Sequence, residues 1–89
     1  MKKLLLVRKL GEKLELPGEA LGELKLSLWG DRMALLENHG GIQHWSEELL
    51  AVRCGGGDLL LYGEKLQIQA MDGGALLLRG KLKKLEWKE

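Results

Sequence analysis

Several residue types are scarce in this 89-residue chain, and each absence excludes a class of protein. A single cysteine excludes a disulfide-stapled scaffold. Aromatic residues make up only 4% of the chain and phenylalanine is missing, so little bulky mass is available for a core. No apolar run approaches the roughly 18 residues that span a bilayer. A net charge of +1 with 45% hydrophobic residues argues against disorder, and the length fits one small domain.

The start of the chain lacks the features of an export signal. Its apolar stretch, residues 4–7, is too short for the core of a signal peptide, and Arg8 and Lys9 follow it directly. The sequence therefore predicts a globular protein of the cytoplasm.

Leucine and glycine are abundant instead, at 23 and 13 positions. Charge is unevenly distributed, because both ends of the chain are basic and the middle, residues 17–79, is acidic. Basic ends could dock onto an anionic membrane surface or an acidic partner. They would equally keep a small leucine-rich domain in solution.

An amphipathic helix is expected over residues 1–17, and Pro17-Gly18 ends it. Four apolar residues recur at helical spacing in one stripe: Leu6, Val7, Leu10 and Leu14. The basic residues are candidates for docking onto a membrane or partner: Lys2, Lys3, Arg8, Lys9 and Lys13. Such a helix usually covers one face of a sheet, and less commonly lies on a membrane.

From residue 18 to 89 a β domain is expected, since apolar residues alternate and glycine-rich turns recur about every ten residues. Eight short strands are predicted, over residues 24–28, 33–37, 42–45, 49–54, 59–62, 66–70, 75–79 and 81–88. Gly63-Glu64-Lys65 is expected to be a turn. The apolar positions change parity around Lys83-Lys84, which predicts a β-bulge.

The predicted fold is all-β, a small antiparallel meander arranged as a sandwich or a partly open barrel, with a β-solenoid of stacked rungs as the alternative. Four of its strands have no polar side, whereas a sheet with one wet face should alternate. A single short helix is too small to cover them, so we expect a second sheet, another copy of the protein, or both. The residues expected to mediate self-association are Leu35, Leu50, Val52, Leu60 and Leu77.

The sequence offers little for catalysis, and we expect no enzyme activity, no metal and no cofactor. His39 and His44 lie near three glutamates, but neither a cysteine nor a third histidine follows at a ligand spacing. Cys54 has only Arg53 nearby to lower its pKa, which favours a buried thiol over a nucleophile. The loop Gly55–Asp58 lacks the lysine and hydroxyl of a phosphate-binding loop.

Nucleic acid is not an expected partner, although small β-barrels often bind it. Such platforms use aromatic side chains for stacking and a basic groove. This chain has three tryptophans and one tyrosine, and most of its β region is acidic. A small β-barrel that binds RNA or a small ligand is nevertheless the alternative from another functional class.

Residues 35–42, Leu-Leu-Glu-Asn-His-Gly-Gly-Ile, preceded by Gly30-Asp31-Arg32, resemble the hallmark of the YabP/YqfC family of sporulation proteins. In that family a strand ends in Glu-Asn-His-x-Gly-Ile. Residues 59–68 and 76–87 are similar to the family's later strands in order and spacing. The Leu16-Pro17 pair after a short basic helix is closer to the YqfC branch.

The resemblance implies a small non-enzymatic protein of endospore-forming bacteria, made in the mother cell, with a membrane protein partner, YqfD in the YqfC branch. It also directs attention to one turn as a candidate functional element: Glu37, Asn38, His39 and Gly41. The turn could either set hairpin geometry or bind a ligand. We thus expect a scaffolding protein that forms homo-oligomers and docks a membrane partner of the sporulation machinery, including a peripheral contact with the membrane.

Overall fold

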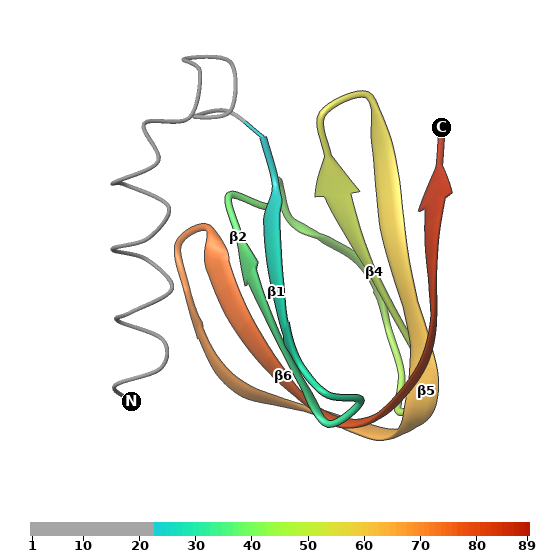
Figure 1. Ribbon diagram of the computed structural model, residues 1–89. Helices are drawn as coiled ribbons and strands as arrows, with labels where there is room; N and C mark the ends of the chain where they lie inside the picture. Colours follow the sequence, from blue (N-terminus) through green and yellow to red (C-terminus); the bar gives the residue numbers. More distant parts are fainter. Residues whose placement is uncertain (1–22) are drawn as a thin grey trace.

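The computed structural model describes residues 23–89, which form six antiparallel strands in one open sheet (Figure 1). The strands are β1 (Lys25–Trp29), β2 (Met33–Glu37), β3 (Ile42–Trp45), β4 (Leu49–Cys54), β5 (Gly57–Asp72) and β6 (Ala75–Lys88). Their order across the sheet is β1-β2-β6-β5-β4-β3. The all-β prediction is confirmed, and antiparallel ladders stand in place of the stacked rungs of a solenoid. The predicted N-terminal helix lies outside the described residues.

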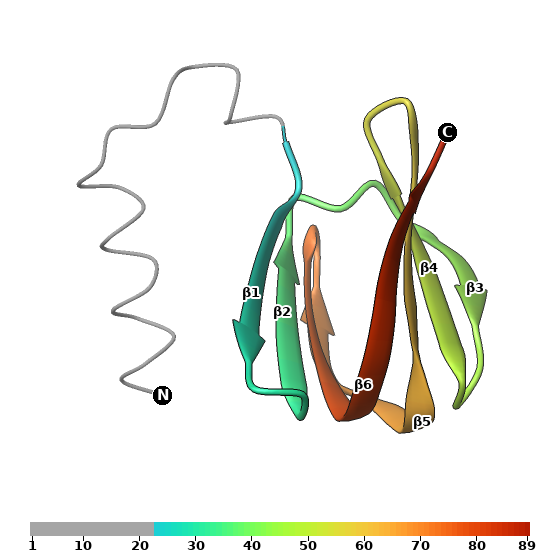
Figure 2. The same cartoon turned by 45° about the vertical axis from the view of Figure 1, so that its right-hand side comes forward.

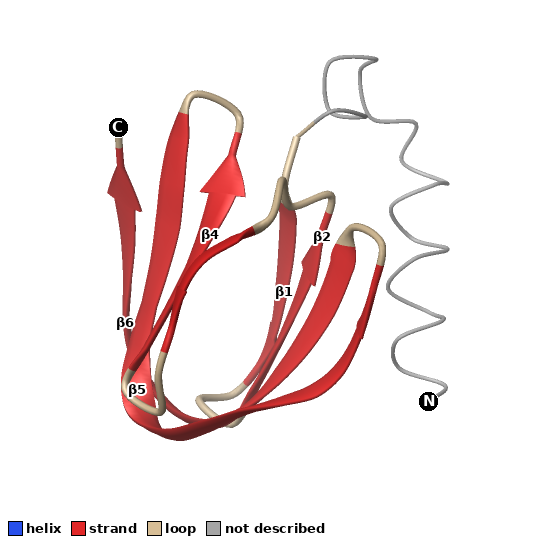
Figure 3. Ribbon diagram, turned by 180° about the vertical axis from the view of Figure 1, so that it is seen from behind, coloured by secondary structure: helices blue, strands red, loops and turns tan. Residues whose placement is uncertain are grey.

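Two long strands, β5 and β6, bend the sheet into two layers that face each other, as Figures 1 and 2 show. We call layer 1 the part in which β1 pairs with β2, β2 pairs with residues 75–79 of β6, and these pair with residues 67–72 of β5. Layer 2 is the part in which β3 pairs with β4, β4 pairs with residues 57–62 of β5, and these pair with residues 84–88 of β6. The view from behind in Figure 3 shows β5 and β6 passing from one layer to the other. The fold is therefore sandwich-like, and its sheet does not close into a barrel.

The structure contains six strands where we predicted eight. Residues 59–62 and 66–70 belong to β5 alone, and residues 75–79 and 81–88 belong to β6 alone. The prediction that Gly63-Glu64-Lys65 is a turn was therefore wrong. This segment is a bend within a continuous strand, and Lys65 adopts a φ of 52° there.

Glycine is required at the bend because other parts of the backbone come very close. A Cβ on Gly63 would collide with the carbonyl oxygen of Lys81, and it would lie 2.8 Å from Cδ2 of Leu66. Gly80 has a φ of +146°, and a Cβ there would lie 2.9 Å from the Cα of Leu66. Leu66 itself is fully buried. The bend is thus a site where two strands and one leucine leave no room for side chains.

Register shifts accompany the bend. Tyr62 pairs with Lys84, whereas the next residue, Gly63, pairs with Leu82, so β6 carries one extra residue at Lys83. This shift confirms the β-bulge predicted around Lys83-Lys84. Bulges increase local twist and bend the strand that contains them, which suits a strand shared by two layers.

The core lies between the two layers and is built almost entirely of leucine. Register partners such as Leu36 and Leu76 in layer 1 face Leu50 and Leu61 in layer 2. The buried cluster comprises Ala34, Leu36, Leu50, Val52, Leu59, Leu61, Leu66, Leu76 and Leu78. Among the described residues no polar or charged residue is buried, so hydrophobic burial accounts for the association of the layers.

The turn between β1 and β2 packs against the bend in β6. The N–H of Gly80 donates to the carbonyl oxygen of Arg32 (3.0 Å), and that of Leu82 donates to the carbonyl oxygen of Asp31 (2.7 Å). Lys81 Nζ lies 3.1 Å from Asp31 Oδ2. The hydrogen bond and charge of Lys81 lower the pKa of the Asp31 carboxyl. This turn therefore covers β6 as far as Leu82.

Candidate functional site

The turn highlighted by the sequence, residues 37–41, ends β2 and leads into β3. Asn38 has a φ of 67° and Gly41 a φ of 123°, conformations that asparagine and glycine tolerate best. The N–H of Gly41 donates to Nδ1 of His39 at 3.0 Å. The histidine side chain therefore caps its own turn, with Nδ1 as the acceptor.

The same turn joins the two layers. In layer 1, the His39 N–H donates to the carbonyl oxygen of Gly74 (3.1 Å) at the tip of the β5–β6 hairpin. In layer 2, the Gly40 N–H donates to the carbonyl oxygen of Arg53 (2.7 Å), and the Arg53 N–H donates to the carbonyl oxygen of Gly41 (2.8 Å). These backbone bonds give the turn a structural role, and the Nε2 atom of His39 is buried there without a hydrogen-bond partner.

The residues predicted for self-association separate into two groups. Leu50 and Val52 are completely buried in the core, so they have no surface for a second copy, and their inclusion needs correction. They face inward because the bent sheet supplies the second layer within one chain. Leu60 and Leu77 lie half-buried on the outward faces of layers 2 and 1, and Leu35 lies beside Leu77 with 6% of its surface exposed.

A different apolar surface is open to solvent. Six large hydrophobic residues of the described part are exposed: Leu28, Ile42, Trp45, Met71, Leu85 and Trp87. Each is the register partner of a core residue that is at most 1% exposed, such as Leu61 for Leu85 and Leu59 for Trp87. Directly paired residues share one face of an antiparallel ladder, so all six lie on the core-facing side. They are exposed because they sit on the outermost strand of each layer, and we call them the apolar rim.

The rim coincides with free strand edges. In the described residues β1 pairs only with β2, and β3 only with β4. Beyond Leu82, β6 pairs only with β5, because its β2 partners end at Arg79. An unpaired edge offers backbone N–H and C=O groups to another strand. Sequence patterns could identify the apolar residues but not which strands would be outermost.

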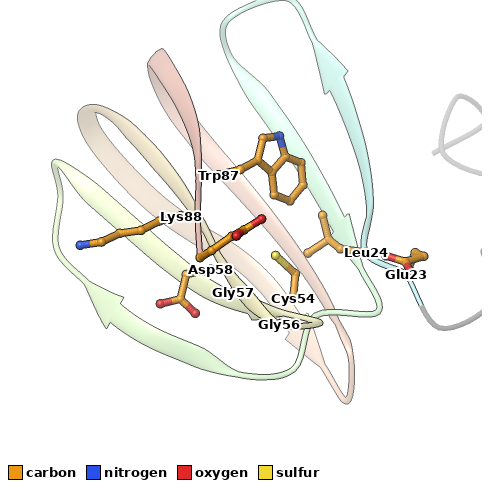
Figure 4. A pocket seen from close by; sticks show the side chains of 9 residues that line it. Glu23, Leu24, Cys54, Gly56, Gly57, Asp58, Trp87 and Lys88 are labelled. Carbon is orange, nitrogen blue, oxygen red and sulfur yellow. The ribbon is translucent and has the colours of Figure 1, made fainter.

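A pocket opens at the end of the sandwich where the two layers separate (Figure 4). Its volume is about 510 Å³, and Trp87 and Leu24 line it from opposite layers. Cys54 lies at its floor with a free thiol, and burial, followed by the charges of Asp58 and Glu23, raises the pKa of that thiol. A raised pKa lowers the thiolate fraction, so this cysteine is poorly suited to be a nucleophile.

The outward face of layer 2 carries a polar cluster across β5 and β6. The Tyr62 hydroxyl donates to Glu86 Oε1 at 3.0 Å, and Lys84 Nζ lies 5.2 Å from the centre of the Tyr62 ring. The hydrogen bond to Glu86 is the main cause that raises the pKa of Tyr62. Here acidic and basic side chains lie on adjacent positions of one exposed face, beside the free edge of β6.

Other predicted features can be placed only in part. The five basic docking residues, Lys2 to Lys13, lie outside the described residues. No helix in residues 23–89 is long and apolar enough to cross a membrane. Within the same residues no group of three or more histidine, cysteine or acidic side chains is arranged to hold a metal ion.

Comparison with known proteins gives one finding. The family model of the YabP family matches residues 8–89, which includes every described residue. No curated protein and no solved structure matches the chain. The motif around His39 and the ordered strands after it therefore belong to a pattern that covers nearly the whole chain, and we conclude that this protein is a member of the sporulation-associated YabP family.

Proposed function

We propose that this protein is a non-catalytic structural protein of endospore formation that assembles with copies of itself and docks onto a membrane protein partner. The apolar rim is the observation that carries this proposal. Trp87, Leu85 and Trp45 lie on the core-facing side of the sheet, yet they remain exposed in the single chain. Exposed apolar surface next to free strand edges is typical of a protein that buries it against another chain.

The absence of catalysis is part of the proposal. Membership of a sporulation-associated family supports a non-enzymatic role. The raised pKa of Cys54 points the same way, since it lowers the fraction of the reactive thiolate.

The partner we propose is a membrane protein of the sporulation machinery, of the YqfD kind, as expected for the YqfC branch of the family. Docking would take place in the mother cell and would use the basic residues of the N-terminal segment. Deleting residues 1–16 should then release the protein from membranes of sporulating cells in a flotation assay. Membrane association that is unchanged by the deletion would overturn this part of the proposal.

Self-association is tested by multi-angle light scattering over a range of concentrations. We expect a mass above that of the 9.9 kDa chain that increases with concentration. A strict monomer at tens of micromolar would contradict the assembly function, whatever the result of the membrane experiment.

The pocket beside Trp87 supports a second candidate, a binding module for a small ligand. Its volume of about 510 Å³ lies within the range of ligand-binding pockets. Since Trp87 lines the pocket, a small apolar ligand should change the tryptophan fluorescence, and Trp87→Leu should remove that change. RNA binding, the other half of this alternative, has no comparable support in the structure.

A further inference from the structure

The exposed edge of β6 has a defined beginning. As far as Leu82 the strand is covered by the β1–β2 turn, through the hydrogen bonds from Gly80 and Leu82 to the turn's carbonyl oxygens. From Lys83 to Lys88 the strand has β5 on one side, and in the described residues no strand on the other. This short edge carries two residues of the apolar rim, Leu85 and Trp87, which are 40% and 63% exposed.

The charges along this edge are complementary to those of a second copy of the same edge that runs antiparallel to it. If Leu85 stands opposite Leu85 of an antiparallel second copy, Lys84 stands opposite Glu86, and this ion pair occurs twice. The same register brings Lys83 opposite Trp87, also twice. No residue from 83 to 87 then faces a like charge. Directly opposite residues in antiparallel strands interact most strongly, so this pattern favours pairing in that register.

We propose that residues 83–87 of β6 pair antiparallel with the same residues of a second copy, around a two-fold axis at Leu85. This inference rests on the proposed self-association and assigns it to one strand edge. The two copies of layer 2 would then form one continuous sheet, from β3 of one copy to β3 of the other. Leu85 would be buried against its equivalent, and the interface would be closed and isologous.

The neighbouring symmetric registers fit less well. Centring the pair on Lys84 places two lysines face to face, and centring it on Glu86 places two glutamates face to face. Centring it on Trp87 places Leu85 opposite Glu89, so that a rim leucine faces a carboxylate. The register centred on Leu85 is therefore the one that uses the free edge and matches its charges.

The charges allow a test in which two defective variants restore each other. Lys84→Glu creates two glutamate pairs across the axis, and Glu86→Lys creates two lysine pairs. Each variant alone should dimerise about tenfold more weakly or worse than the wild type, measured by sedimentation velocity with the full chain. An equimolar mixture should dimerise again, because every opposite pair in the mixed dimer is then one glutamate and one lysine. The double variant should also dimerise by itself.

Two controls separate this result from changes within one chain. Tyr62→Phe removes the hydrogen bond to Glu86 without altering a charge, and it should leave dimerisation unchanged. Arg79→Glu makes the same change in net charge as Lys84→Glu on the exposed outward face of layer 1, and it should also have no effect.

The outcomes distinguish this inference from the broader function. If the wild type associates but the two single variants associate equally well, the β6 register is wrong and self-association stands on another surface. If both single variants are monomeric and their equimolar mixture is monomeric too, the proposed pairing of Lys84 with Glu86 across the axis is wrong. A wild type that is monomeric throughout would overturn self-association itself, and with it this inference.

Discussion

Individual glycines determine whether the sheet of this protein can fold back on itself. Gly63 and Gly80 both face Leu66, which fills the remaining space at the bend. Gly56, in an open hairpin turn, differs from both, because no atom lies within 4 Å of its would-be Cβ. Equal substitutions at these positions should therefore have very different consequences.

Gly63→Ala should destabilise the domain by about 2 kcal/mol or more, because the new methyl group must displace the Lys81 backbone or the Leu66 side chain. Gly56→Ala should be neutral or stabilising by about 0.5 kcal/mol, since it only restricts the unfolded chain. Urea denaturation followed by tryptophan fluorescence measures both. Equal unfolding midpoints for the two variants would show that the bend tolerates a side chain.

His39 offers a second contrast at the same scale. His39→Ala removes the acceptor for the Gly41 N–H and should cost about 1 kcal/mol of stability. His39→Asn should recover most of that loss, because an asparagine oxygen can accept from the N–H two residues later. Thermal unfolding of the three proteins tests the order. If asparagine is as damaging as alanine, the histidine has a role other than capping the turn.

At the scale of strands, the sequence predicted most of the elements correctly. The observed bounds of β2, β3 and β4 are those expected from alternation and turn residues, and β1 is displaced by one residue. The bulge near Lys83 was also predicted, because a change of parity leaves a visible trace in the sequence. The bend at Gly63 left no such trace. Glycine followed by two charged residues looks the same whether the chain turns back or passes into another layer.

The cross-strand contact between β5 and β6 gives a pH-dependent prediction. Tyr62 is the only tyrosine, so the ultraviolet absorbance of tyrosinate reports on it alone. Its pKa is raised by the hydrogen bond to Glu86, and Glu86→Gln should move the titration midpoint to lower pH because it removes the negative charge. Glu86→Ala should move it further, since no acceptor is left. An unchanged midpoint in both variants would mean that the contact is not formed in solution.

The sign of the effect on stability follows from the same shift. A group whose pKa is raised on folding contributes stability that is fully present below its unfolded pKa, here the ordinary tyrosine value of 10.0. That contribution is lost as the pH rises through the higher pKa of the folded state. Wild type and Glu86→Ala should therefore become more alike in stability under strongly alkaline conditions.

For the whole molecule, the sequence predicted a surplus of apolar surface but not its location. Doubly apolar strands suggested that Leu50 and Val52 would meet another copy, whereas the bent sheet buries both within one chain. The exposed residues, such as Leu85 and Trp87, lie on the core-facing side at the outer strands. Which strand is outermost depends on pairing between distant segments, and the local pattern of one segment carries no information about it.

Two paired leucines test this difference between interior and rim. Leu61 and Leu85 are register partners on the same face, but Leu61 is completely buried and Leu85 is 40% exposed. At low protein concentration Leu61→Ala should cost about 3 kcal/mol of stability, and Leu85→Ala about 1 kcal/mol or less. Urea titrations at low concentration give both values. A cost at Leu85 as large as that at Leu61 would show that the rim is buried in the monomer.

The two long strands also determine when the chain can fold during its synthesis. Besides β1, β2 pairs with residues 75–79 of β6, which come about 40 residues later in the chain. Besides β3, β4 pairs with residues 57–62 of β5. On the ribosome the first hairpins therefore emerge before the strands that they pack against, with their leucines uncovered. The domain can close its core only after β6 has been translated, and until then the nascent chain is a natural client for chaperones that bind exposed apolar segments.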